Sequence, residues 1–149
     1  MGLIRGNHRV GQNTYHLEWC TKYRYKMFRK EENRKLCEEI LRKVAERHGI
    51  GIVELSVMPE HIHIIADISP TMSVSESFRL IKGGSSHELF KEKPNFRKRY
   101  PRGHLWSPGK FYRTVGGTDI ETTRSYVRNQ GMVHQTTLSQ FFPNGSPAL

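Results

Sequence analysis

The chain has 149 residues, 36% of them hydrophobic and 26% charged, which fits one globular domain over residues 1–149 and excludes disorder over most of it. Its 24 Lys and Arg against 14 Asp and Glu give a net charge of +10, which favours polyanionic partners, nucleic acid before an acidic membrane surface. No apolar run approaches the roughly 18 to 20 residues that span a bilayer, and a signal-peptide core is missing, so we expect a cytoplasmic protein. Cys20 and Cys37 form no C-x-x-C motif and predict reduced thiols.

The first half of the chain predicts a strand, a helix and a hairpin. Residues 14–20, TYHLEWC, alternate apolar and polar side chains with the period of a half-buried strand. Apolar residues recur at helical spacing over residues 31–48, and Gly49 stands where a helix would end. Residues 50–57 and 61–68 then read as two strands joined by a short turn.

The second half continues with a helix over residues 74–91. Gly83 and Gly84 interrupt its pattern at a cost of about 1 kcal/mol each relative to alanine, which indicates that something approaches the backbone closely there. Residues 91–110 are rich in Pro, Gly and positive charge and have no period, so they predict a long connecting loop.

The chain closes with a fourth strand, KFYRTVG, and a third helix that starts at a capping box and is expected to end near Gln130. This order predicts an α+β fold: the ferredoxin-like or RRM-like β-α-β-β-α-β sandwich with an extra C-terminal helix. Both main helices should cover one face of the sheet and leave the other open. We expect residues 1–12 and 135–149 to be weakly ordered or docked on a partner.

Two histidines stand inside the apolar run HIHIIADI. Because side chains alternate along a strand, His61 and His63 point to the same face, opposite to the isoleucines. Neighbours at i and i+2 lie roughly 6.5 to 7 Å apart, so both rings can reach one metal ion or one phosphate. The spacing permits such a site without establishing it.

The third helix carries Tyr126 and Gln130, which are four residues apart and share one side of the helix. Tyrosine can act as a nucleophile and glutamine offers a carbonyl oxygen. From the spacing alone, packing of Tyr126 on the sheet with a solvated Gln130 is the commoner explanation, because aromatic residues on helices are usually packing residues. Taken with the histidines, an amide oxygen completes a mixed nitrogen and oxygen site suited to Mg²⁺ or Mn²⁺.

From YHLEWCTKYRYKMF through VMPEHIHIIADI, LIKGGSSHELF and HLWSPGKFYRTVGG to SYVRNQ, the chain resembles the single-tyrosine HUH transposases of the IS200/IS605 insertion sequences. Glu60 stands where that family usually has aspartate. The resemblance implies that Tyr126 is the nucleophile and that His61, His63 and Gln130 bind a divalent ion, Mg²⁺ or Mn²⁺. The implied reaction cuts and rejoins single-stranded transposon ends through a 5′-phosphotyrosine, and no residue of the sequence is identifiable as the base that deprotonates the tyrosine.

The resemblance also implies partners. Family members recognise single-stranded DNA with hairpins at the transposon ends, and they form homodimers in which the tyrosine helix of one subunit serves the histidines of the other. Candidate DNA contacts, chosen from charge and position alone, are Lys22, Arg24, Arg79, Lys82, Arg97 and Arg102.

Two alternatives stay open. A non-catalytic RRM-like module would bind single-stranded nucleic acid on its open sheet face, but HIHIIADI lacks the aromatic residues of an RRM strand. A histidine-triad phosphohydrolase would need a third alternating histidine at position 65, where the chain has Ile65.

Overall fold

The structure, a computed structural model, describes residues 13–116 and 119–141, with side chains only as far as Gln130. It contains a four-stranded antiparallel sheet in the order β2-β3-β1-β4. The strands are β1 (Thr14–Cys20), β2 (Gly51–Val57), β3 (His61–Asp67) and β4 (Phe111–Thr114), and the helices are α2 (Glu31–Arg47), α3 (Val74–Glu92) and α4 (Ile120–Phe141), with 3₁₀ turns η1 (Lys22–Arg24) and η2 (Pro94–Lys98). This order and pairing confirm the predicted ferredoxin-like α+β fold.

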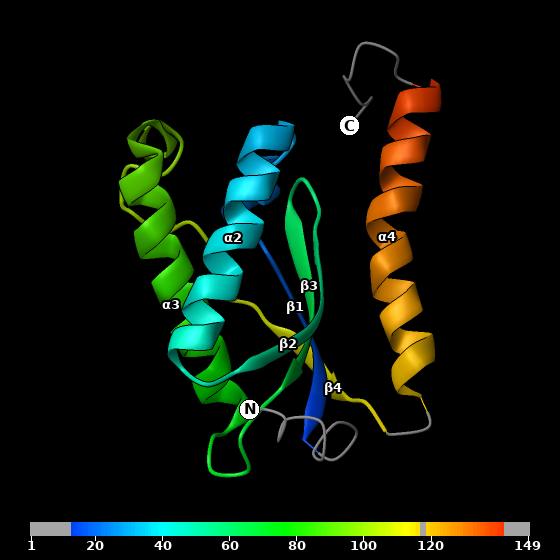
Figure 1. The fold of residues 1–149 in the computed structure, drawn as a ribbon. Coiled ribbons are helices and arrows are strands. Elements are labelled where there is room, and N and C mark those ends of the chain that lie inside the picture. Colours follow the sequence, from blue (N-terminus) through cyan, green and yellow to red (C-terminus); the bar gives the residue numbers. More distant parts are fainter. Residues whose placement is uncertain (1–12, 117–118, 142–149) are drawn as a thin grey trace.

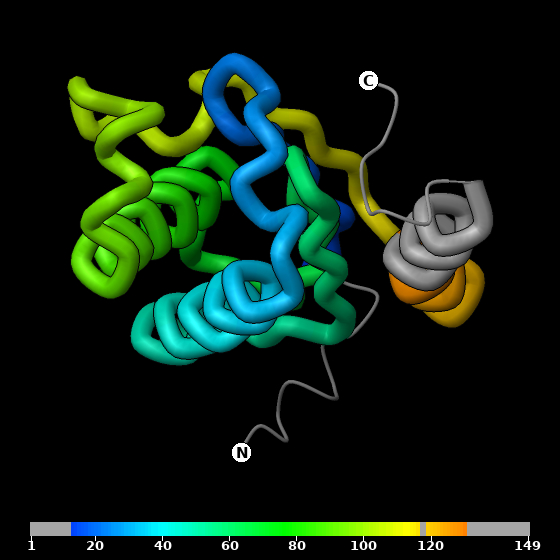
Figure 2. The backbone as a smooth tube through the Cα atoms, turned by 90° about the horizontal axis from the view of Figure 1, so that it is seen from above, coloured from blue at the N-terminus to red at the C-terminus, as the bar shows by residue number. Residues whose placement is uncertain are grey.

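The sheet separates two layers of helices (Figures 1 and 2). Helices α2 and α3 lie side by side on one face, and α4 lies on the other. The core between the sheet and the first two helices contains Leu17 and Trp19 of β1 together with Leu41 and Val44 of α2. None of the helices in the described residues is long and apolar enough to cross a membrane.

The second sheet face is covered where the sequence predicted it to be open. Helix α4 packs across β2 and β3, and Val127 of α4 is fully buried there. As a result β3 is covered from both sides: Ile64 and His63, which point to opposite faces, are both buried. The expectation of an open face was wrong because the extra helix folds back over its own sheet.

Two predicted boundaries differ from the structure. Helix α4 runs to Phe141 rather than ending near Gln130, because a single glycine such as Gly131 costs only about 1 kcal/mol inside a helix and does not have to end it. The predicted capping box covers positions 118–121, and its first residue lies outside the described residues, as do residues 1–12 and 142–149.

The segment predicted as a long loop, residues 91–110, contains regular secondary structure and contributes side chains to the core. It includes the end of α3 and the turn η2, and its side chains Phe96, Tyr100, Leu105 and Trp106 are buried. These anchors occur at irregular spacing, so no periodic pattern could reveal them.

The glycine pair in α3 lies in a continuous helix, and its two members differ. A Cβ on Gly84 would lie 2.7 Å from Cγ1 of the buried Val44 in α2, whereas a Cβ on Gly83 would meet nothing within 4 Å. The close approach expected from the sequence is therefore confirmed at Gly84, where two helices touch, and it does not occur at Gly83.

We expect Gly84→Ala to lower the free energy of unfolding by about 1 to 2 kcal/mol, because the β-branched Val44 cannot turn aside and overpacking outweighs the gain in helix propensity. The matched variant Gly83→Ala should raise the same quantity by about 0.5 to 1 kcal/mol. Urea denaturation of both variants measures the difference; equal effects of the two substitutions would contradict this account of the contact.

Candidate active site

The central strands bring polar side chains together on the sheet face beneath α4. In the antiparallel register Glu18 of β1 stands opposite His63 of β3, and Cys20 stands opposite His61. His16 lies two residues before Glu18 and therefore shares its face. The site thus draws on both central strands, where the backbone is held most firmly by its neighbours.

The imidazoles form a connected row. Nε2 of His61 lies 3.1 Å from Nε2 of His63, and Nδ1 of His63 lies 3.1 Å from Nε2 of His16. On the outer side, Nδ1 of His61 lies 3.2 Å from a carboxylate oxygen of Glu60, which can only accept a hydrogen bond. A neutral His61 that donates from Nδ1 to Glu60 keeps the lone pair of its Nε2 directed toward His63.

Burial sets the protonation states in this row. Desolvation, reinforced by the neighbouring His61 and His16, lowers the pKa of His63 to about 3, so His63 is neutral at physiological pH. Burial also lowers the pKa of His16. The hydrogen bond from His61 lowers the pKa of Glu60 to about 2, which keeps that carboxylate charged. A neutral His63 is in the state that metal binding requires.

Tyr126 of α4 stands next to this row. Its ring centroid lies 6.4 Å from that of His16 and 6.4 Å from that of His63, in both cases edge to face, and 52% of the residue is exposed. Helix α4 is held there by the buried Val127 and by Arg124 and Arg128, whose guanidinium groups each lie 3.4 Å from Glu54 of β2. Tyr126 is therefore anchored beside the histidines and open to solvent.

Gln130 lies one turn farther along α4 and is half-buried. Within residues 13–116 and 119–130, no hydrogen bond joins it to a histidine. The structure thus brings three of the four predicted site residues close together and leaves Gln130 on the same side of the helix as Tyr126, without a hydrogen bond to the described histidines.

The donor atoms fit a divalent ion. Two adjacent ligands of an octahedral ion, each at about 2.1 Å, lie about 3 Å apart, which matches the separation of the two Nε2 atoms of His61 and His63. A second, overlapping donor group consists of His16, Glu18 and His63, whose ligand atoms all lie within 4.8 Å of one another. His63 belongs to both groups.

His16 and Glu18 were not predicted as site residues. The sequence indicated only which face of β1 they occupy. They alternate along the strand with the core residues Leu17 and Trp19 and therefore face away from the main core. The face alone does not say which strand lies beside β1 or in which register, and only that pairing places His16 against His63.

The six predicted DNA contacts are not brought together in one place. Lys22 lines one cavity with Arg102 and another with Lys82, and Arg24 lines a third. Three of the six have local partners: Arg79 pairs with Glu76 at 2.6 Å, Lys82 donates to the carbonyl oxygens of Ser107 and Gly109, and the guanidinium carbon of Arg97 lies 4.6 Å from the centroid of the Phe90 ring.

The chain is an α+β protein with a ferredoxin-like sheet. Paired histidines lie on one face of this sheet, and a helix that carries a tyrosine lies beside them. The family described as "Transposase IS200 like" matches residues 9–130. The chain belongs to this IS200-like transposase family and is a transposase of the insertion-sequence type.

Individual relatives agree. The chain is 29% identical over 128 residues to the ISDra2 transposase TnpA of Deinococcus radiodurans, covering 86% of this chain and 91% of that protein. It is 32% identical over 116 residues to the transposase for insertion sequence element IS200 of Salmonella typhimurium, covering 78% and 75%.

Two solved structures are similar. The first, from Deinococcus radiodurans R1 and described as a transposase, has 30% identity and a TM-score of 0.64 and covers 78% of this chain and 89% of its own. The second, a REP-associated tyrosine transposase bound to a REP hairpin, shares the fold with a TM-score of 0.60 at 17% identity, covering 82% of this chain and 68% of its own.

Proposed function

We propose that the chain, as a single domain, cuts and rejoins single-stranded transposon ends by metal-assisted transesterification through a 5′-phosphotyrosine. The observation that carries this proposal is the position of the solvent-exposed Tyr126 ring, 6.4 Å from the rings of both His16 and His63. A nucleophile of this kind needs a phosphate held beside it. The nitrogens of His61 and His63 converge and can hold a metal ion that binds this phosphate.

In the proposed reaction His61, His63 and Gln130 hold the divalent ion, which supplies Lewis-acid polarisation of the scissile phosphate. The phenol oxygen of Tyr126 attacks that phosphorus and loses its proton to solvent, and the bond from phosphorus to the 3′ oxygen breaks. The 3′ oxygen takes up a proton from solvent and leaves as a 3′ hydroxyl, while the 5′ phosphate stays on the tyrosine. The exchange of one phosphodiester for another conserves its bond energy. A free 3′ hydroxyl can therefore reverse the step and join new ends without ATP.

The direct test is to trap a covalent protein–DNA adduct on single-stranded ends from the flanking genome. The family's hairpin-bearing ends are the substrate we assign to this chain, and the same sequence as a duplex serves as the control, which should give no adduct. The alternative function, a non-catalytic RRM-like single-strand binder, predicts binding without any adduct.

We also propose that the active form is a homodimer with shared sites. The described part of the sheet ends in β4, whose four residues are all exposed, including the large side chains Phe111 and Tyr112. An edge strand of this kind favours pairing with a second copy. Gly116 and Gly117 follow each other in the short connection between Thr114 of β4 and Ile120 of α4, and the wide range of backbone angles open to glycine permits α4 to dock on either copy.

If the sites are shared, Tyr126→Phe and His63→Ala should each be inactive alone and should restore partial cleavage when combined in one dimer. Each shared site combines the histidines of one subunit with the α4 helix of the other, which carries both Tyr126 and Gln130. The mixed dimer therefore contains one site with both defects and one site with neither. We would coexpress the variants with different tags, purify the mixed dimer and measure adduct formation. An intact mixed dimer as inactive as its parents would show that each subunit uses its own helix, as α4 is placed in the single chain.

A further inference from the structure

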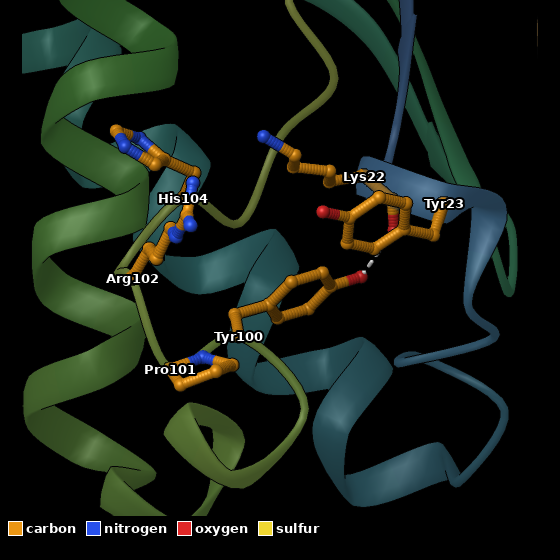
Figure 3. Close-up of a pocket in the computed structure, with 6 residues that line it drawn as sticks. All are labelled: Lys22, Tyr23, Tyr100, Pro101, Arg102 and His104. Atoms are coloured by element: carbon orange, nitrogen blue, oxygen red, sulfur yellow. Dashed lines mark hydrogen bonds between the residues drawn. The ribbon is translucent and has the colours of Figure 1, made fainter.

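A group of tyrosines and basic residues lies just beyond β1, outside the histidine site (Figure 3). Lys22, Tyr23, Tyr100, Pro101, Arg102 and His104 line a cavity of about 330 Å³, which we name the tyrosine pocket. Its size is at the lower end of the range for small-ligand sites and suits one nucleotide better than a duplex.

The two tyrosines of the pocket have different environments. Tyr100 is 2% exposed, and its hydroxyl donates to the carbonyl oxygen of Lys22 at 2.8 Å, so it forms a fixed wall. Tyr23 is 67% exposed, and its ring is nearly parallel to that of Tyr100, with 13° between the planes and 6.4 Å between the centroids. Tyr25 supports the same cluster, 5.5 Å from Tyr23. Tyr23 is therefore held in place while most of its surface faces solvent.

The backbone at Tyr23 is unusual. Tyr23 and the next residue, Arg24, have φ values of 62° and 54°, in the left-handed region that residues other than glycine, asparagine and aspartate seldom adopt. Hydrogen bonds hold this conformation: Lys22 N–H donates to the carbonyl of Leu105, and Arg24 N–H to that of Thr21. Such a conformation persists only when its surroundings impose it, and it is commonly found at ligand sites.

The charge around the tyrosine pocket is positive. Lys22 and Arg102 line it, and Nζ of Lys22 lies 5.5 Å from the centroid of the Tyr23 ring. A second cavity, lined by Tyr25 of the same tyrosine cluster, adds Arg24, Lys26, Arg29, Lys30 and Arg99. Among the described residues that line these two cavities there is no Asp or Glu.

We propose that the tyrosine pocket binds one unpaired nucleobase of single-stranded DNA, stacked on Tyr23, with a neighbouring phosphate paired to Lys22 and Arg102. Stacking on an exposed aromatic ring combined with basic side chains is the usual basis of single-strand binding. The inference rests on the proposed function, since it assigns a subsite to the same DNA substrate.

The tyrosine pocket is placed so that one single-stranded DNA molecule could occupy it and also reach the histidines. Cys20, the last residue of β1, stands opposite His61, and the N–H of Thr21 donates to the carbonyl of Glu60 at 2.9 Å. The pocket begins one residue later, at Lys22. It thus lies toward the same end of the sheet as His61.

The test uses a twelve-residue oligothymidylate in which one thymine is replaced by photoreactive 5-iodouracil. Irradiation of the complex with the full chain, followed by peptide mapping, should place the crosslink on Tyr23. Tyr23→Ala should weaken binding of the unmodified oligonucleotide about 5- to 100-fold, whereas Tyr23→Phe, which keeps the ring, should bind within about twofold of the original chain. Melting temperatures show whether each variant is folded.

Salt dependence tests the phosphate contact separately. Arg102→Ala should reduce the slope of log affinity against log salt concentration by about 0.7, the value for one phosphate of a single strand. Arg47→Ala removes an equally charged residue that is paired with Glu88 and lines neither cavity, and it should leave the slope unchanged.

The outcomes separate the pocket from the proposed chemistry. A crosslink elsewhere, with undiminished affinity in Tyr23→Ala, overturns the pocket, even if adduct formation through Tyr126 still supports the transposase reaction. A crosslink on Tyr23 without any adduct supports the pocket and counts against the reaction. Tighter capture of an oligouridylate on Tyr23 would assign the pocket to RNA and overturn the proposal. If Tyr23→Ala does not fold, the crosslink position on the original chain decides.

Discussion

Tyr126→Phe is expected to abolish cleavage and adduct formation while leaving the fold and DNA binding intact. The substitution removes one oxygen and keeps the ring that packs edge to face against His16 and His63. In the proposed reaction the lost oxygen is the attacking atom, so the loss should exceed about 10³-fold. Adduct formation on a labelled single-stranded end and a parallel binding measurement provide the two readouts.

Tyr112→Phe is the matched control. Tyr112 is as exposed as Tyr126, at 51% against 52%, and lies on the edge strand β4 rather than beside the histidines. Its hydroxyl should be dispensable for cleavage. If Tyr126→Phe cut single-stranded ends at the original rate, Tyr126 could not be the nucleophile.

His63→Ala, or chelation with EDTA, should likewise stop cleavage while DNA binding remains, because binding depends mainly on phosphate contacts. His63 is the residue shared by both possible donor groups, and its removal leaves neither complete. We expect Mn²⁺ affinity, measured by calorimetry or electron paramagnetic resonance without DNA, to fall by at least about tenfold. His87→Ala, an exposed histidine on α3 across the sheet, should change neither readout.

The same measurement distinguishes the donor groups. If the ion binds to His61, His63 and Gln130, His61→Ala should weaken Mn²⁺ binding as strongly as His63→Ala, and Glu18→Gln should have a small effect. The reverse ranking would assign the ion to His16, Glu18 and His63. Undiminished metal binding in His63→Ala would contradict both assignments.

The sequence by itself determined the main elements, because each is encoded by a local pattern. The alternation in TYHLEWC and HIHIIADI and the helical spacing from residue 31 predicted β1, β3 and α2 within a residue of their observed ends. The same period of two placed His61 and His63 on one face. The close packing at Gly84 could also be predicted from the sequence, because a glycine inside a helix lowers stability and is expected where a neighbouring element leaves no space for a side chain.

The tertiary structure decided how these elements meet. No local pattern indicates that Glu18 pairs with His63, that His16 contacts its ring, or that α4 returns over β2 and β3 to cover them. The buried anchors of residues 91–110 and the left-handed turn at Tyr23 likewise depend on contacts far apart in the sequence, such as Tyr100 with Lys22. Burial against distant segments sets the strand register, the docking of α4 and the neutral state of His63. A local sequence pattern does not predict that burial.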